Sequence, residues 1–327
     1  MDVIVVGLGS MGRRRIRLLK KYDEKIKIIG VDISDDRRTK VENEFNIETT
    51  DSLINACECS DIGAAFVSTS PLSHAAIIND CLNHDLHVFT EINLVLDGYD
   101  ENIELSKQKN KLLFLSSTFL YRKEIGYIKK KVHDCNESLS YIYHVGQYLP
   151  DWHPWENYKN FFVENVRTNG CRELMAIEFP WITDVFGDIT SIKSIRGKHS
   201  KLDIDYPDTY HIIVEHEDHH KGMIEIDIVS RKAERRLEVF GENLFITWDG
   251  TPESLSEYNI DEKSYDSIHL YDDYQRKDGY EQYIIEDAYY SEIVNFFESI
   301  NNNIVPRYSF EKDKKILELV DYIERGD

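Results

Sequence analysis

The 327-residue sequence has far fewer basic than acidic side chains and no long apolar run. Its 39 lysines and arginines stand against 60 aspartates and glutamates, which gives a net charge of -21 at pH 7. Because nucleic-acid partners are bound through clustered lysines and arginines, this balance argues against such a partner. No apolar stretch approaches the length that spans a bilayer, and the first predicted strand begins at residue 3, too early for a signal peptide. We expect no membrane partner.

Cysteine is also scarce, with five residues in the whole chain. Cys57 and Cys59 form a Cys-Glu-Cys stretch, which lacks the four-ligand pattern of a structural zinc site. His219 and His220 resemble a metal site only superficially, because such a polar stretch more often forms a hairpin turn. We therefore expect no metal, and a reduced, cytoplasmic location.

The beginning of the chain carries its clearest motif. A short apolar strand over residues 3–6 runs directly into Gly7-x-Gly9-x-x-Gly12. Gly7 allows a tight turn, Gly9 lets backbone amides approach a pyrophosphate, and Gly12 lets the next helix pack closely on the sheet. The helix N-terminus then favours the negative phosphates. The residues expected to bind them are Gly7, Gly9, Ser10, Met11 and Gly12.

Asp32 closes the second predicted strand, twenty positions after Gly12. Its carboxylate can accept hydrogen bonds from both ribose hydroxyls of NAD and would repel the 2′-phosphate of NADP. NAD is therefore expected in preference to NADP. Arg37 and Arg38 follow closely enough to keep NADP open, although a solvated helix start also explains them.

The length suits two domains. The first third alternates β-rich runs with helical stretches, which predicts an α/β fold with parallel strands joined by right-handed crossovers, a Rossmann doubly wound sheet. Later runs alternate like Ile224 and Ile226 against Glu225, which predicts an open, mostly antiparallel sheet. We expect an NAD-binding Rossmann domain over residues 1–119 and an α+β substrate-binding and dimerisation domain over 120–327. The predicted strands are 3–6, 26–31, 64–68, 87–90, 112–116, 140–147, 190–197, 210–216, 222–229, 236–241 and 243–248, and the predicted helices are 13–21, 72–83, 99–109, 123–133, 287–300 and 310–324.

Two later strand ends resemble those of the Gfo/Idh/MocA oxidoreductases. Residues 66–74, Phe-Val-Ser-Thr-Ser-Pro-Leu-Ser-His, are similar to a strand ending in Thr-Pro-x-x-x-His, and residues 86–93, Leu-His-Val-Phe-Thr-Glu-Ile-Asn, to one ending in Glu-Lys-Pro. The similarity continues through Arg122, residues 237–244 and Pro306. It implies a nicotinamide over the carboxyl ends of the strands, near Thr69 to Pro71, with Glu91 near its ribose. The cofactor residues expected in this part of the chain are Thr69, Ser70, Pro71, His74, Glu91 and Asn93.

The catalytic part of the resemblance does not match. The resemblance implies that the Lys of Glu-Lys-Pro bonds the reacting hydroxyl and that an Asp-x-Gly-x-His-x-x-Asp helix supplies acid and base. Here Ile92 stands at the Lys position and Asn93 at the Pro position. Aligning Asp184 with the final Asp places Trp181 at the His and Ile177 at the first Asp. The usual catalytic groups therefore cannot be assigned.

A loop over residues 146–158 offers one replacement, because it holds two Trp, two Tyr, one His and one Asp. Aromatic faces cover the C–H faces of a sugar ring, while carboxylate and imidazole bond its hydroxyls. His153 is the preferred acid or base because imidazole titrates near neutral pH, and Tyr148 comes next. An interdomain or dimer contact is the other interpretation. The expected substrate contacts in this loop are Asp151, Trp152, Trp155 and Tyr158.

The stretch from Arg172 to Asp184 offers a second possible replacement for the usual catalytic groups. If it is helical, Glu173 shares a face with Trp181, Glu178 lies on the adjacent face, and Pro180 breaks or kinks the helix. If the carboxyl of Glu178 is buried against Trp181, its neutral form is favoured and it suits a general acid or base. The alternative is a surface glutamate without a catalytic role. Arg172 could pair with an acidic substrate group or cap the helix. The candidates are thus His153, Glu178 and Tyr148 for catalysis, and Arg122, Asp151, Trp152, Trp155, Tyr158, Arg172 and Glu173 for substrate.

Together these features predict an NAD-dependent oxidoreductase that transfers a hydride to or from a sugar, cyclitol or sugar-derived substrate. Two alternatives stay open. One is a non-redox enzyme of the same fold that uses NAD transiently for elimination or epimerisation, and the other is a catalytically silent NAD-binding partner protein. Because one face of the second sheet would be left free, we also expect a homodimer or homotetramer through that sheet.

Overall fold

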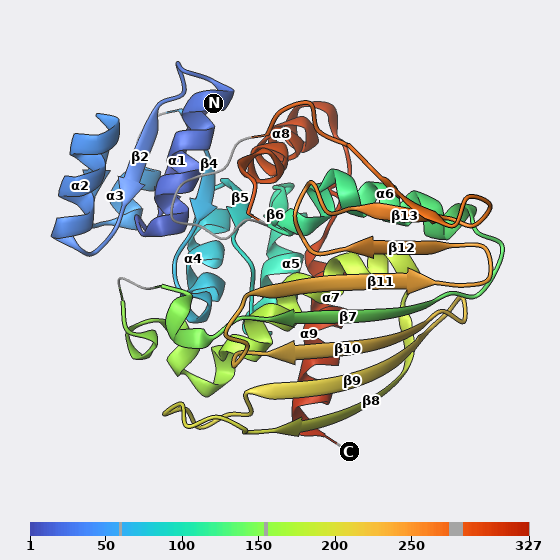
Figure 1. Cartoon of the computed structure of the whole chain (residues 1–327). Helices are drawn as coiled ribbons and strands as arrows, with labels where there is room; N and C mark the ends of the chain where they lie inside the picture. Colours follow the sequence, from blue (N-terminus) through green and yellow to red (C-terminus); the bar gives the residue numbers. More distant parts are fainter. Residues whose placement is uncertain (59–60, 154–155, 275–283, 327) are drawn as a thin grey trace. The chain divides into compact units, whose positions relative to one another are not determined.

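The computed structural model describes residues 1–58, 61–153, 156–274 and 284–326 (Figure 1). The chain divides into two compact units. The first contains Met1–Ser117 and Tyr289–Lys315, and the second contains Thr118–Ala288 and Ile316–Asp327. The chain therefore returns to the first unit after residue 288, and the predicted second domain over 120–327 did not include this return.

The first unit is built on a parallel sheet. Its strands are β1 (Asp2–Val6), β2 (Ile28–Val31), β3 (Glu48–Thr50), β4 (Ile62–Val67), β5 (His87–Thr90) and β6 (Leu113–Leu115). Among the residues described, their order is β3-β2-β1-β4-β5-β6, with every neighbouring pair parallel. Because β1 pairs with both β2 and β4, the strand order reverses beside β1, and ligands of such sheets bind outside the carboxyl ends of the strands at this point. The predicted doubly wound sheet is confirmed.

Helices flank this sheet (Figure 1). The middle residues of β1, Val3 to Val5, are fully buried, as expected of a strand covered on both faces. Helix α1 turns Ile16 and Leu19 inward, and helix α4 begins with Pro71, whose fixed φ suits the first turn. The helices of this unit are α1 (Ser10–Tyr22), α2 (Asp35–Phe45), α3 (Leu53–Cys57), α4 (Pro71–Asn83) and α5 (Tyr99–Lys109), with most of α8 (Glu286–Asn302) and the start of α9 (Phe310–Arg325).

The second unit is built on a larger sheet. Its elements are α6 (Lys123–Asp134), β7 (Ser140–Gly146), α7 (Gly170–Phe186), β8 (Ile189–Gly197), β9 (Thr209–His216), β10 (Lys221–Asp227), β11 (Glu234–Phe240), β12 (Phe245–Trp248), β13 (Ser256–Asn259) and β14 (Ser264–Ser267). Among the residues described, the strand order is β14-β13-β12-β11-β7-β10-β9-β8. Only β7 and β10 pair in parallel among these neighbours. Helices α6 and α7 lie on one side of the sheet, and the other side faces the reader in Figure 1. The predicted mostly antiparallel sheet is confirmed.

The two faces of this sheet differ in burial. In β10, Ile224 and Ile226 are buried, whereas Met223, directly before Ile224, is 57% exposed. Met223 pairs with Ile142 of β7 and with Ile213 of β9, whose side chains are also exposed. These three residues form an apolar row across the open face, which we call the sheet-face row.

Several elements depart from the sequence-based expectation. Helix α1 begins at Ser10, directly after the glycine turn. Strands β3, β13 and β14 were not predicted, because they are only three or four residues long and none has a buried residue to mark an alternation. Helix α7 continues through Pro180, which was expected to break or kink it. Phe179, Trp181 and Ile182 around that proline are fully buried, so their packing outweighs the missing backbone hydrogen bond.

Candidate cofactor and active site

The three glycines of the first turn meet different surroundings. Gly7 has a φ of +90°, which favours glycine, and a Cβ there would lie 2.6 Å from the carbonyl oxygen of Ser68. A Cβ on Gly12 would lie 1.8 Å from the carbonyl oxygen of Gly7, so helix α1 cannot pack on the turn with a larger residue. A Cβ on Gly9 would meet no described atom within 4 Å. The turn thus needs Gly7 and Gly12 for its own structure, while the space beside Gly9 is open.

That open space lies at the beginning of α1. Gly9 is the N-cap residue and, as a glycine, has no side chain with which to cap the helix. An N-terminus of this kind attracts anions, because its first amides point outward and the helix dipole is positive there. The geometry around Gly9 therefore fits the pyrophosphate of a dinucleotide.

Substitution of Gly9 separates this role from folding. We expect Gly9→Val to weaken binding of NADH by roughly 100-fold or more, since its side chain would occupy the space through which the phosphates approach. Its unfolding free energy should change by at most about 1 kcal/mol, because a Cβ there meets no described atom within 4 Å and valine is only a weaker N-cap residue than glycine. Calorimetric titration and thermal unfolding measure the two effects. Gly12→Ala is the contrasting variant and should lose stability as well, and tight NADH binding by Gly9→Val would contradict the assignment.

The carboxylate of Asp32 lies at the carboxyl end of β2. It accepts hydrogen bonds from the backbone N–H of Leu8 at 2.8 Å and of Ser34 at 2.9 Å, which fix its orientation. A carboxylate has about four acceptor sites, so two are left for ribose hydroxyls. Arg37 Nη1 lies 3.5 Å from Asp32 Oδ2, and its side chain is mostly exposed. The site thus has an anion suited to a ribose and a cation beside it.

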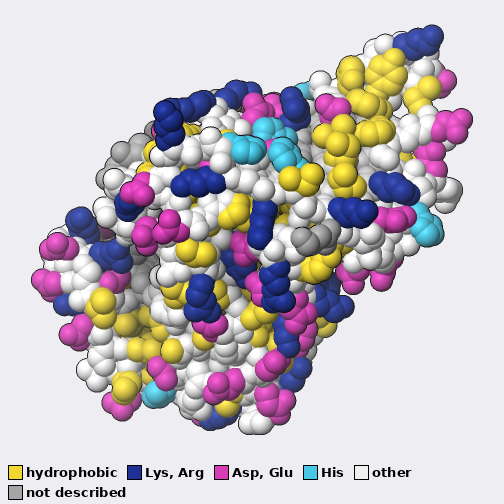
Figure 2. Space-filling view, turned by 90° about the horizontal axis from the view of Figure 1, so that it is seen from below, with side chains coloured by type: hydrophobic (Ala, Val, Ile, Leu, Met, Phe, Trp, Pro, Cys, Tyr) yellow, Lys and Arg dark blue, Asp and Glu magenta, His cyan; other side chains and the backbone are white. Residues whose placement is uncertain are grey.

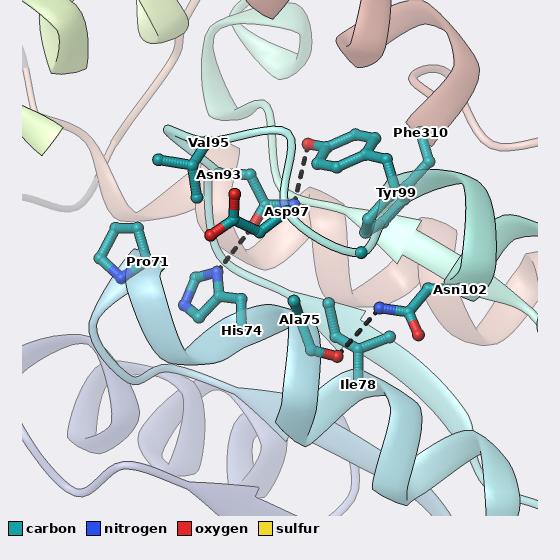
Figure 3. A pocket seen from close by; sticks show the side chains of 11 residues that line it. Pro71, His74, Ala75, Ile78, Asn93, Val95, Asp97, Tyr99, Asn102 and Phe310 are labelled. Carbon is teal, nitrogen blue, oxygen red and sulfur yellow. Dashed lines mark hydrogen bonds between the residues drawn. The ribbon is translucent and has the colours of Figure 1, made fainter. Parts of the chain in front are cut away.

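The turn after β4 holds a second group of the expected cofactor residues. Thr69, Ser70 and Pro71 connect β4 to α4. His74 of α4 is buried, with Nε2 3.1 Å from the carbonyl oxygen of Thr69. Its Nδ1 lies 2.6 Å from Asn93 Oδ1 (Figure 3). The structure therefore brings His74, Asn93 and Thr69 together.

Glu91, the first residue after β5, is held by Arg15 of α1. Arg15 donates to the two carboxylate oxygens of Glu91 at 2.6 and 3.1 Å, and also to Glu292 of α8 at 2.8 Å. Burial raises the pKa of Glu292, and the charge of Arg15 opposes this. Sequence analysis missed Arg15 and Glu292, which lie 277 positions apart. Their cluster ties the helix of the glycine turn to the end of β5.

The loop after β7 is pinned near both ends of its described part. The guanidinium carbon of Arg231 lies 3.7 Å from the centre of the Tyr148 ring, which is a cation–π contact. Trp152 donates through Nε1 to the carbonyl oxygen of Gln147 at 3.0 Å. The hydroxyl of Tyr158 accepts from the backbone N–H of Asp203 at 3.2 Å.

His153 and Asp151 of this loop differ in surroundings. His153 packs on Phe161 with ring centres 4.5 Å apart, and burial lowers the pKa of its imidazole. Asp151 is exposed. Trp155, predicted to contact substrate, lies outside the described residues.

Glu178 of α7 lies in a closed cluster. It is fully buried and accepts two hydrogen bonds from Arg235, at 2.9 and 2.6 Å, through Oε1. Through Oε2 it accepts from Tyr143 Oη and from Trp181 Nε1, each at 2.6 Å. These four hydrogen bonds use all the acceptor sites of the carboxylate within the second unit. This favours a structural role over proton exchange.

The two arginines predicted to bind substrate are also paired within the protein. Arg172 donates to Asp321 at 2.6 Å and to Glu324, both on α9. Arg122 donates to Glu124 at 2.6 and 3.0 Å and to the carbonyl oxygen of Gly250 at 3.0 Å. Each guanidinium is nearly fully buried, so these contacts support packing more directly than ligand recognition.

Glu173, one turn before Ile177 on the same face of α7, has a different environment. Its Oε2 is buried and has no hydrogen-bond partner among the described residues. Burial raises the pKa of Glu173 to about 8, and the charge of Arg235 acts in the opposite direction. A carboxyl that titrates near neutral pH can both take up and release a proton under cellular conditions. Of the acidic residues proposed on this helix, Glu173 is the one suited to proton exchange.

Comparison with known proteins agrees with this geometry. A family model described as the oxidoreductase family with an NAD-binding Rossmann fold matches residues 1–117. A myo-inositol 2-dehydrogenase from Thermotoga maritima is 22% identical over 338 residues, covering 97% of this chain and 93% of its own. Residues 1–117 thus match the Gfo/Idh/MocA oxidoreductase family.

Solved structures share the fold of the family over both units. An oxidoreductase from Desulfitobacterium hafniense, named as NADPH-dependent, has a TM-score of 0.82 at 13% identity, covering 99% of this chain and 94% of that one. UDP-N-acetylglucosamine 3-dehydrogenase from Acidithiobacillus ferrooxidans has a TM-score of 0.78 at 13% identity, covering 99% and 97%. Myo-inositol 2-dehydrogenase from Lactobacillus plantarum also reaches 0.78, at 16% identity, covering 99% and 96%.

The match over residues 1–117 makes the first unit an NAD(P)-binding Rossmann domain. The open space at Gly9 and the free acceptor sites of Asp32 fit such a cofactor. Within the described residues, no three His, Cys, Asp or Glu side chains are grouped to hold a metal ion. In that same part of the chain, no helix combines the length and the apolar character of a membrane span.

Proposed function

We propose that the chain is an NAD-dependent oxidoreductase that transfers a hydride to or from a hydroxyl-bearing carbon of a sugar, cyclitol or sugar-derived substrate. The observation that carries this proposal is the open space at Gly9, at the N-terminus of α1 and beside Asp32. A bound nicotinamide supplies the hydride acceptor or donor. The protein must then bind the substrate and exchange one proton with its oxygen.

The substrate class is supported by two observations. Three of the related proteins named above are dehydrogenases of inositol or of an N-acetylglucosamine nucleotide. The loop after β7 presents Tyr148, Trp152 and Tyr158 beside Asp151, a combination of aromatic faces and a carboxylate that suits a polyol ring.

Glu173 is the group to which we assign proton exchange. Its unpartnered oxygen and its raised pKa support this assignment, whereas Glu178 is committed to Arg235. His153 and Tyr148 remain the candidates from the loop, and the lowered pKa of His153 leaves it neutral and able to accept a proton at pH 7.

A substrate panel tests the function. Purified protein is mixed with NAD and a set of sugars, cyclitols and nucleotide sugars while the absorbance of reduced cofactor is followed. We expect reduction with at least one polyol. Turnover without net absorbance change, together with solvent hydrogen at a substrate carbon, would instead indicate elimination or epimerisation. Cofactor binding without any turnover across a broad panel would favour a silent NAD-binding partner.

Asp32 is proposed to select NAD over NADP. We expect NADH to bind at least about tenfold more tightly than NADPH, because the 2′-phosphate would lie against the carboxylate. Asp32→Ala should reduce or reverse the preference for NADH over NADPH, since Arg37 would then face the phosphate without the carboxylate beside it. Asp36→Ala, an exposed carboxylate on α2, is the matched control and should leave the ratio unchanged. Equal affinities for both cofactors in the unaltered protein would refute this preference.

The open face of the second sheet is proposed to bind a second copy of the chain. The sheet-face row exposes Ile142, Ile213 and Met223 side by side, and such faces are usually covered. Figure 2 shows the molecule from below, a view in which basic and acidic side chains are interspersed.

The sheet-face row gives the test of this proposal. Met223→Asp should convert the assembly to monomers in light scattering, whereas Lys221→Asp at the exposed start of the same strand should not. A monomeric unaltered protein at micromolar concentration would contradict the proposal.

A further inference from the structure

A buried chain of hydrogen bonds leads away from the turn after β4, all within the first unit. From the carbonyl oxygen of Thr69 it passes to His74, to the side-chain amide of Asn93, to the hydroxyl of Tyr99 and to Asp313 on α9. Figure 3 shows its middle part, from His74 through Asn93 to Tyr99. Asn93 Nδ2 lies 2.9 Å from Tyr99 Oη, and the Tyr99 hydroxyl donates to Asp313 Oδ2. Asn93 stands where the family resemblance places proline, which has no amide to link His74 to Tyr99.

Asp313 is the titratable end of this chain. The side chains that face it among the described residues are Tyr99, through Oδ2, and Tyr308, which donates to Oδ1 at 2.9 Å. Burial raises the pKa of Asp313 to about 7, although both tyrosine hydrogen bonds lower it. Its proton is therefore gained or lost near neutral pH.

His74 is the other end. Burial lowers the pKa of its imidazole, against hydrogen bonds to Asn93 and Thr69 and the negative charge of Glu91, so the ring is held neutral with one N–H. Thr90 Oγ1 lies at 3.4 Å from Nδ1. A neutral ring has one donor and one acceptor nitrogen, and only the tautomer with hydrogen on Nε2 can donate to the carbonyl oxygen of Thr69.

The direction in which each hydrogen bond of this chain is donated depends on the protonation state of Asp313. When Asp313 is protonated, it donates to Tyr99, the Tyr99 hydroxyl donates to Asn93 Oδ1, and the amide N–H of Asn93 donates to Nδ1 of His74. Nε2 then keeps its hydrogen for Thr69. When Asp313 is ionised, Tyr99 donates to it, the amide of Asn93 turns its nitrogen to Tyr99, and its oxygen takes the hydrogen of Nδ1. The chain has then lost one proton, and Nε2 has none to donate.

A small cavity lies beside the middle of the chain. Its volume is about 10 Å³, roughly that of one water molecule. His74, Asn93, Asp97, Tyr99 and Asn102 are among the residues around it (Figure 3). The space thus adjoins the side chain of Asn93.

We propose that Asp313 is a positioning residue for the cofactor site, whose proton determines, through Tyr99 and Asn93, which nitrogen of His74 carries hydrogen and whether His74 holds the carbonyl of Thr69. The proposal rests on the proposed function in placing the nicotinamide near Thr69. The tautomer of His74 does not depend on that placement, so the two can fail separately.

Nuclear magnetic resonance of the ¹⁵N-labelled full-length protein tests the tautomer. The ring nitrogens of His74 are assigned by comparison with His74→Gln and followed from pH 6 to 9. We expect hydrogen on Nε2 at low pH and on Nδ1 at high pH. Asp313→Asn and Tyr99→Phe should abolish this change, while the matched control Tyr308→Phe, which removes the other hydrogen bond to Asp313, should retain it. A His74 ring that does not change in the unaltered protein overturns the proposal, and so does a change that persists in Asp313→Asn.

Cofactor affinity gives the second measurement. Calorimetry with NADH should show binding weakened by roughly threefold to tenfold between pH 6 and 8.5, the value of one hydrogen bond, and no such trend in Asp313→Asn. A trend equal in both proteins would contradict the role of Asp313. Absence of NADH binding at every pH would reject the proposed function, while the tautomer experiment would still decide the inference. Should Tyr99→Phe not fold, Asn93→Leu interrupts the chain at the next position and carries the same expectation.

Discussion

Replacement of Glu173 by Gln is expected to lower kcat for hydride transfer by roughly 10²–10⁴-fold, the usual loss on removal of a positioned acid or base. Glutamine keeps the length of the side chain but cannot exchange a proton. Since Oε2 of Glu173 accepts no hydrogen bond from a described residue, the substitution breaks none at this atom, and stability should be retained. Steady-state kinetics on the substrate found in the panel measure kcat and KM, and KM should change little.

The pH dependence gives this prediction a second signature. With a pKa of about 8, Glu173 is mostly protonated at pH 7 and ionised at pH 9. Oxidation of an alcohol needs the ionised form to accept a proton, so its rate should rise up to about pH 8 and then level off. Reduction needs the protonated form, so its rate should be level below about pH 8 and fall above it. The residual activity of Glu173→Gln should show neither of these two pH dependences.

Matched variants distinguish Glu173 from the loop. Glu164→Gln changes an exposed carboxylate that precedes α7 and should leave kcat unaltered. His153→Gln and Tyr148→Phe are measured beside it, because a larger loss in either would move proton exchange to the loop. Full activity of Glu173→Gln would end the assignment of Glu173.

Local signals made the first unit predictable. The turn from Gly7 to Gly12 contains its own strand, glycines and helix start, and β1 is a run of buried apolar residues, so both follow from neighbours in the sequence. The second sheet followed from alternation, as in β10. Short strands such as β13 had no such alternation, and the packing around Pro180 is not encoded by the residues next to it.

Long-range pairs explain why the site was harder to predict. For Glu178 the sequence left a buried carboxyl and a surface glutamate open, because its partner Arg235 lies 57 positions away and only that partner decides whether the carboxylate is free. Asp313 and Tyr99 are separated by 214 positions. A signal was nevertheless present, because Glu292 and Asp313 stand among apolar residues on helices with one buried face, where an acidic residue needs a partner.

Glu178 itself carries the second large prediction, on stability. Glu178→Ala should lower the unfolding free energy of the second unit by about 3–5 kcal/mol, because it leaves the buried Arg235 guanidinium without its carboxylate and the donors of Tyr143 and Trp181 without an acceptor. Urea unfolding followed by tryptophan fluorescence measures this loss. All four tryptophans of the sequence lie between residues 152 and 248, so the signal reports on the second unit alone.

The same helix supplies the control. Asp184 pairs with Lys129 at 2.7 Å, but both side chains are about one-third exposed, so Asp184→Asn should cost at most about 1 kcal/mol. Replacing Glu178 and Arg235 together by Met should recover much of the loss, because no buried charge is then left unpaired. Equal costs for Glu178→Ala and Asp184→Asn would mean that the Glu178 cluster is not a buried support. In that case Glu178 would return as a candidate for proton exchange, because its carboxylate would be open to solvent and substrate.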